Sequence, residues 1–181
     1  RQPRRAQQIR AHRFVAVGPG ERHTLGAYDV RVHAAAHGVP GSCVLYDVTG
    51  PGGRVLYATD TGPLPDTTVQ AVAGARFDAV LLEETFGDHV THGTDHLDLR
   101  TFPDQLRRLR EAGAVTRGTD VVAVHLSHRN PPDLAARLAP WGARVVPDGT
   151  TLGARREPAP VGRTLVIGGA RSGKSSAAES L

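Results

Sequence analysis

The feature that most constrains the fold is a series of short apolar segments. Each of them is followed, at or just after the end of its apolar run, by an acidic residue or a histidine. They are "YDVRVHAAAH" (28–37), "RVLYATDTG" (54–62), "FDAVLLEETF" (77–86) and "DVVAVHLSH" (120–128). Short runs of aliphatic and β-branched residues bounded by turn residues are typical of buried strands. Polar residues at the ends of neighbouring strands meet at one edge of a sheet, where ligands usually bind.

Turn and helix signals separate these segments. A Pro-Gly-Gly turn at 51–53 follows "SCVLYDVTG" and indicates paired strands. The clearest helix is expected at 101–114, where Leu106 and Leu109 share one face and Gly113 ends the pattern. Two further helices are expected at 65–75 and 131–142, and a closing strand at 143–152. We therefore expect an α/β fold in which a sheet is flanked by helices.

Composition excludes several classes of protein. The 181 residues are 39% hydrophobic, which is enough for one core, and they contain no apolar run long enough to cross a membrane. The single cysteine, Cys43, excludes an internal disulfide framework and favours the cytoplasm. The net charge is +4, but the basic residues are scattered and aromatic residues make up only 4%, so we do not expect nucleic-acid binding.

A phosphate-binding motif lies near the end of the chain. "GGARSGKS" (168–175) fits the G-x-x-x-x-G-K-[ST] loop, after an apolar strand and before a helical run. Gly168 and Gly173 allow backbone N–H groups to converge on phosphate oxygens, Lys174 would neutralise the phosphates, and Ser175 would bind Mg²⁺. Lys174 is the only lysine in the chain. The motif predicts ATP or GTP binding together with Mg²⁺.

The sequence of this motif resembles the N-terminal sequence of the adenosylcobinamide kinase and adenosylcobinamide-phosphate guanylyltransferase family of cobalamin biosynthesis. The resemblance covers about residues 163–181. It implies a P-loop nucleotide-binding domain whose remaining functional residues would follow Leu181. These residues alone are therefore not expected to perform that chemistry.

The strand-end motifs resemble those of the metallo-β-lactamase fold hydrolases, most closely the branch with the tRNA 3′-processing endonuclease and small phosphodiesterases. The resemblance covers about residues 26–152. It implies that His37, Asp60 and His125 are metal ligands and that Asp60 bridges two ions. Imidazole and carboxylate ligands suit Zn²⁺, Mn²⁺ or Fe, and such ions activate water against phosphate esters or carbonyl groups.

The same resemblance implies roles for two further residues. His96 would donate a proton to the leaving group, and Glu83 would orient His96. His92 is the competing candidate for the proton donor, and His128 is an alternative to His125. Simpler roles also remain open, namely a turn cap for Asp60 and a helix cap or loop residue for His96.

The chain departs from the family pattern in one respect. The signature H-x-H-x-D-H, which supplies most ligands of both metals, is absent. "HVTHGTDH" (89–96) has different spacing and follows Asp60, so it is either a separate metal cluster or an ordinary loop. We expect the signature to lie upstream, which would leave this chain with three ligands and a low metal affinity.

These observations predict the middle of a bifunctional protein. Residues 1–25 would be a basic lead-in that ends a missing N-terminal half, 26–152 a partial αββα sandwich, 153–162 a linker and 163–181 a truncated kinase domain. The parent would be a metal-dependent hydrolase acting on a small molecule, either a phosphodiester or a corrinoid intermediate. The alternative is a non-catalytic scaffold attached to the nucleotide-binding enzyme. The fragment alone is expected to have little turnover.

Overall fold

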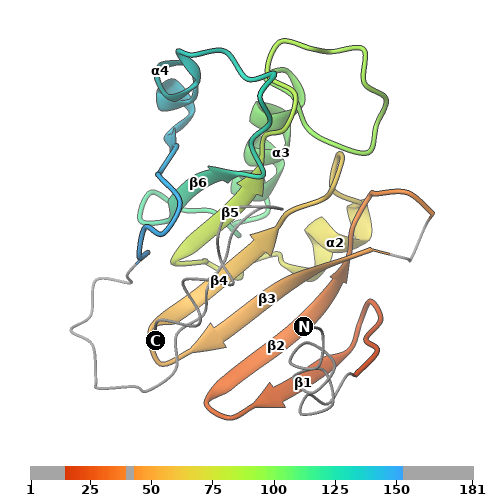
Figure 1. The fold of residues 1–181 in the computed structure, drawn as a ribbon. Helices are drawn as coiled ribbons and strands as arrows, with labels where there is room; N and C mark the ends of the chain where they lie inside the picture. The colour runs from red at the N-terminus through yellow and green to blue at the C-terminus, as the bar shows by residue number, and fades with distance from the viewer. Residues whose placement is uncertain (1–14, 40–42, 153–181) are drawn as a thin grey trace, which may run out of the picture.

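The computed structural model of the chain describes residues 15–39 and 43–152. These residues form one seven-stranded sheet in the order β1-β2-β3-β4-β5-β6-β7 (Figure 1). The strands are β1 (Arg22–Leu25), β2 (Tyr28–Ala34), β3 (Val44–Gly50), β4 (Gly53–Ala58), β5 (Ala79–Glu83), β6 (Asp120–Val124) and β7 (Ala143–Arg144). The expected α/β fold class is consistent with this mixed sheet and its helices.

The direction of the strands fixes where their ends lie. Strands β1 to β4 pair antiparallel, whereas β4, β5, β6 and β7 pair parallel. Because β2 and β4 are both antiparallel to β3, they run in the same direction as β5 and β6. The carboxyl ends of β2, β4, β5 and β6 therefore lie at one edge of the sheet.

The helices pack on one face of this sheet. They are α2 (Asp66–Ala71), α3 (Thr101–Glu111), α4 (Leu134–Leu138) and the 3-10 turn η1 (Ala139–Trp141). The hydrophobic core joins strand residues such as Leu56 and Leu82 to Leu106 of α3 and Leu138 of α4, all of which are fully buried. Removing these apolar groups from water stabilises the helix layer on the sheet.

The opposite face of the sheet is also apolar. Side chains alternate along a strand, so Tyr46 and Val48 of β3 lie opposite Leu45 and Asp47, which are on the helix face. On this second face, Val32, Leu81 and Val122 are buried but do not belong to the core cluster under the helices. Both faces of the sheet are thus built to be covered, as in a layered sandwich.

Several elements differ from the sequence-based prediction. Strand β1 was not predicted, because "RHTL" is too short and too polar to give a pattern, yet it pairs with β2 along its whole length. The predicted closing strand at 143–152 is only two residues long, and Pro147 and Gly149 lie in the segment after it, where they do not favour a strand. The helix predicted at 131–142 is divided into α4 and η1, since Pro140 cannot donate the next helical hydrogen bond.

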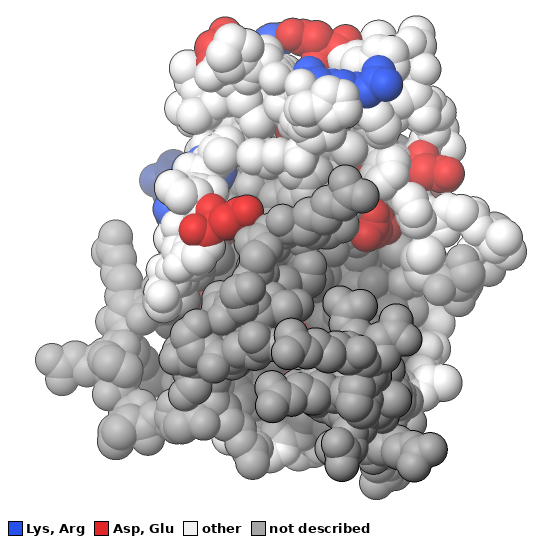
Figure 2. All heavy atoms as spheres, viewed as in Figure 1, with Lys and Arg blue, Asp and Glu red and all other residues white. Residues whose placement is uncertain are grey.

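The remaining predictions about organisation concern other parts of the chain. The linker at 153–162 and the P-loop at 163–181 lie outside the described residues. No helix within 15–39 and 43–152 has both the length and the apolar character needed to cross a bilayer. Basic and acidic side chains are interspersed over the described surface that Figure 2 shows.

Candidate metal centre

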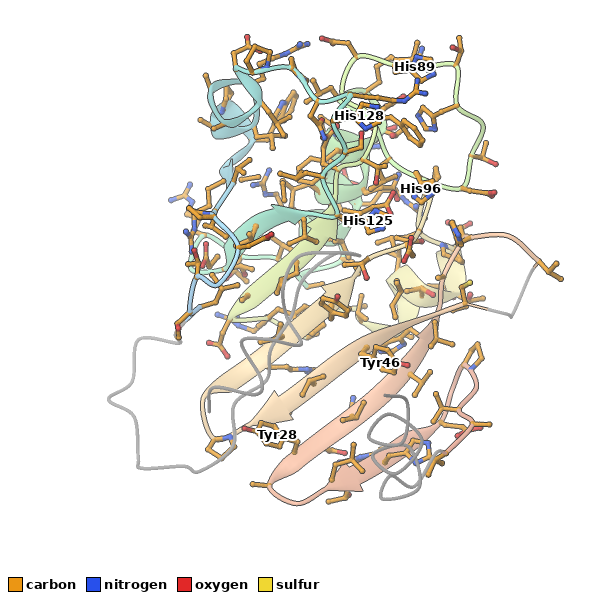
Figure 3. The ribbon with its side chains drawn as sticks, in the orientation of Figure 1. Tyr28, Tyr46, His89, His96, His125 and His128 are labelled. Carbon is orange, nitrogen blue, oxygen red and sulfur yellow. The ribbon has the colours of Figure 1, made fainter. Side chains whose placement is uncertain are left out.

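Four potential ligands converge where the strands end. Asp60 lies two residues after β4, Glu83 is the last residue of β5, and His125 directly follows β6. His96 comes from the long loop between β5 and α3 and lies beside His125 at this edge (Figure 3). One ligand atom from each of these four residues lies within 4.8 Å of the others, and they form the one such group among the described residues. We call Asp60, Glu83, His96 and His125 the strand-end cluster.

Direct contacts connect the members of this cluster. His125 Nε2 lies 3.0 Å from Asp60 Oδ1, and His96 Nδ1 lies 3.1 Å from Glu83 Oε2. The rings of His96 and His125 stack with centroids 5.5 Å apart. Thr85 Oγ1 lies 2.9 Å from His125 Nδ1, so the other ring nitrogen of His125 is the one that faces Asp60.

The backbone is strained at two of these positions. Asp60 has φ of 50° and His125 has φ of 57°, both in the left-handed region that non-glycine residues seldom adopt. Such conformations cost on the order of 1–3 kcal/mol each and persist only where the surrounding structure enforces them. Here they turn the two side chains toward each other immediately after β4 and β6.

Glu83 fixes the positions of three segments. Its side chain is fully buried, and its carboxylate accepts hydrogen bonds from the backbone N–H of Thr61 at 3.0 Å and of Leu97 at 2.6 Å. Together with the contact to His96, these bonds connect β5 to the loop after β4 and to the loop before α3. A buried carboxylate held in this way positions its neighbours and is poorly accessible to a ligand from solvent.

A close backbone approach holds the loop that carries His96. The Gly62 N–H donates to the carbonyl of Ala36 at 2.8 Å, and a Cβ at Gly62 would lie 1.7 Å from the carbonyl oxygen of Thr94. Only glycine fits at this position. The glycine of "TDTG" is thus a signal of the site that sequence reasoning did not use.

His37 lies beside the strand-end cluster but is not a member of it. Its Nδ1 lies 3.0 Å from the carbonyl oxygen of Asp95, and its ring contacts His96 edge-on at 4.7 Å between centroids. In this arrangement His37 supports the His96 loop. Its role as a metal ligand therefore remains a prediction.

The two alternative histidines lie elsewhere. His92 is buried, stacks on Phe86 at 4.2 Å between centroids and contacts Asp98 Oδ2 at 3.2 Å, while His128 is exposed. Within the segment 89–96, only His96 belongs to a group of possible ligands among the described residues. His96 is therefore the better placed of the two proton-donor candidates.

Two buried acidic residues were not anticipated. Burial raises the pKa of Glu84 to about 7, and only its Oε1 accepts a hydrogen bond, from the Gly87 N–H at 3.0 Å. Asp98 is also buried, but hydrogen bonds from Thr101, Arg100 and His92 outweigh this burial and lower its pKa. The "DLRT" sequence before α3 carries a capping signal that would have identified Asp98. Nothing in "LLEETF" shows that both glutamates are buried.

The donor set fits a divalent metal. Two imidazoles and carboxylate oxygens are the ligands of zinc, manganese and iron sites. Two ligands of a tetrahedral zinc, each about 2.1 Å from the ion, lie about 3.4 Å apart. The 3.0 Å between His125 Nε2 and Asp60 Oδ1 is close to this separation.

Several solved structures are similar to this chain in fold. The metallo-β-lactamase fold protein YhfI from Bacillus subtilis is 19% identical, with a TM-score of 0.56 over 78% of this chain and 58% of its own. A diphosphatase of the PhnP family is 19% identical, with a TM-score of 0.56 over 79% of this chain and 49% of its own. Zinc-bound PqqB from Methylobacterium extorquens is 18% identical, with a TM-score of 0.57 over 75% of this chain and 54% of its own.

This chain has a metallo-β-lactamase-like fold. It spans about half to three fifths of the length of these three structures. No protein-family model and no curated protein matches it. Among the described residues of this fold, the strand-end cluster is the one group of side chains that could hold a metal ion.

Proposed function

We propose that this chain is part of a metal-dependent hydrolase whose active site is the strand-end cluster. The observation that carries the proposal is the convergence of four ligand atoms within 4.8 Å at the carboxyl ends of β4, β5 and β6. The metal-dependent hydrolases of this fold support it. Asp60 and His125 would hold a divalent ion, with His37 as a further predicted ligand. The bound ion would supply Lewis-acid activation of the scissile group.

His96 would act as the proton donor. The Glu83 carboxylate at Nδ1 orients the imidazole and leaves Nε2 free to face a substrate. A protonated His96 would release the Nε2 proton to the leaving oxygen as the scissile bond breaks. Because the Glu83 carboxylate is buried and also accepts two backbone N–H groups, it would keep the ring in place through the reaction.

The rest of the catalytic site would come from another segment. The histidine signature expected in this fold is not in the chain. A segment that carried these histidines to the strand-end cluster would complete its metal site.

Metal binding and hydrolysis test the proposal separately. Zinc binding is measured by equilibrium dialysis with the full-length wild-type protein, its Asp60→Asn variant and the matched control Asp104→Asn, at an exposed aspartate of α3. We expect Asp60→Asn to weaken binding at least tenfold and Asp104→Asn to leave it unchanged. In the full-length protein, His96→Asn is expected to abolish most hydrolysis of bis(p-nitrophenyl) phosphate while zinc remains bound. Equal zinc binding by wild type and Asp60→Asn would refute the proposed centre, and a full-length wild-type protein that binds no zinc would favour the scaffold alternative.

A second activity is proposed for the C-terminal sequence. We propose that residues 163–181 begin a nucleotide-binding domain of the cobinamide kinase and guanylyltransferase type, in which Gly168, Gly173, Lys174 and Ser175 cradle the phosphates. The support is the motif itself, with the chain's only lysine inside it. Equilibrium binding of ATP and GTP with Mg²⁺ to the full-length protein and to Lys174→Ala tests this proposal. Unchanged affinity in the variant would contradict it.

A further inference from the structure

The aromatic ring of Phe86, beside the strand-end cluster, contacts three histidines and one arginine. The ring of Phe86 stacks on His92 at 4.2 Å and contacts His89 at 5.9 Å and His96 at 5.5 Å between centroids. The guanidinium carbon of Arg129 lies 5.9 Å from the same centroid. The negative face of an aromatic ring attracts a cation, so the Arg129 guanidinium is held at the ring that also contacts the proposed proton donor, His96.

The guanidinium of Arg129 is not paired with a carboxylate of any described residue. Most arginines of the described residues form ion pairs with carboxylates, namely Arg22, Arg54, Arg100, Arg107, Arg108, Arg137 and Arg144. The exposed guanidinium of Arg129 has no hydrogen bond or ion pair with any described residue, although its backbone N–H donates to Ser127 Oγ.

The acidic groups near this ring are already occupied. Asp88 is bound by Arg137 through two hydrogen bonds, which lower its pKa. Asp98 is buried under His92 and accepts the backbone N–H groups that precede α3. Neither carboxylate forms an ion pair with Arg129. Among the described residues Arg31, Arg76 and Arg117 also lack an ion pair, but Arg129 is the one that lies at a ring in contact with the strand-end cluster.

We infer that Arg129 binds an oxyanion of the substrate, on the side of the site where His96 protonates the leaving group. This inference rests on the proposed function, because it takes the strand-end cluster as the reacting centre. A guanidinium donates two parallel hydrogen bonds to a phosphate or carboxylate and gains nothing comparable from a neutral ester. Arg129 would therefore be a specificity-determining residue that selects anionic substrates.

Binding of small anions to the metal-free chain tests this role without turnover. Phenyl phosphate, benzoate and neutral benzyl alcohol are titrated into the ¹⁵N-labelled protein in EDTA, and amide chemical shifts give each affinity. The variants are Arg129→Gln and the matched control Arg117→Gln, another exposed arginine in the turn before β6, at the opposite edge of the sheet. We expect Arg129→Gln to weaken phenyl phosphate binding about tenfold and Arg117→Gln to leave it unchanged.

The competing outcomes have distinct meanings. If Arg129→Gln weakens the binding of the anions, an oxyanion site at Arg129 is supported. Tighter binding of phenyl phosphate than of benzoate then assigns the site to phosphoryl groups, and tighter binding of benzoate assigns it to carboxylates. Equal binding by wild type and Arg129→Gln, equal weakening in both variants, or binding of benzyl alcohol as tight as that of the anions would overturn the inference. Since no metal is present, these results are independent of the zinc measurement that tests the proposed hydrolase centre.

Discussion

Replacement of Glu84 by glutamine should change how stability depends on pH. Burial raises the pKa of Glu84 from 4.5 to about 7, and its Oε2 has no hydrogen-bond partner among the described residues. The folded chain therefore keeps this proton at a pH where the unfolded chain has lost it. The contribution of Glu84 to stability is complete below about pH 4.5 and is lost as the pH rises to about 7. At about 1.36 kcal/mol per pKa unit, this loss is about 3 kcal/mol.

Glutamine has nearly the same shape and does not ionise. We therefore expect the free energy of unfolding of Glu84→Gln, relative to wild type, to rise by about 3 kcal/mol between pH 4.5 and pH 7.5. The measurement is urea unfolding in EDTA, followed by circular dichroism and by the fluorescence of Trp141, the only tryptophan. Glu111→Gln, at an exposed position of α3, is the control and should follow wild type within about 0.5 kcal/mol. Parallel pH profiles for wild type and Glu84→Gln would refute the reasoning.

Two further substitutions test the packing around the site. Gly62→Ala should lower the free energy of unfolding by more than about 2 kcal/mol, because its Cβ would collide with the Thr94 carbonyl. Gly52→Ala is the control and should cost far less, because a Cβ at Gly52 meets no atom within 4 Å. Equal effects of the two substitutions in urea unfolding would contradict this prediction. Asp47 is buried, but two hydrogen bonds from Arg54 outweigh that burial and lower the pKa of Asp47 from 3.8 to about 2. The free energy of unfolding should therefore fall by about 2 kcal/mol as the pH falls from 4 to 2. Acid unfolding of Asp47→Asn should lack this step, and an unchanged acid profile would be inconsistent with the pair.

The strand ends could be identified from the sequence because they combine two local signals. An apolar run indicates a buried strand, and the polar residue that ends it must lie at the edge of the sheet. These signals place Asp60, Glu83 and His125 at one edge of the sheet, the family resemblance implies their roles, and the structure brings them together with His96. The parallel directions of β4, β5 and β6 explain why residues so far apart in sequence meet.

Other features depend on contacts that no local pattern encodes. The choice between His92 and His96 was open because both lie in one loop with similar neighbours, and it depends on which of them reaches Glu83 or Asp98. The family resemblance implies that His37 is a metal ligand, but in the structure its Nδ1 contacts a carbonyl of the His96 loop. That Arg129 has no ion pair with any described residue can be known only from the structure.

Anomalous X-ray diffraction at the zinc edge, from crystals grown with Zn²⁺, tests the central claim most directly. The account predicts a zinc peak within about 2.2 Å of an Asp60 carboxylate oxygen and of His125 Nε2, with Glu83 still bound to the Thr61 and Leu97 N–H groups. Zinc at any other place, or crystals in which Asp60 and His125 remain in direct contact with no ion between them, would contradict a metal centre at these strand ends.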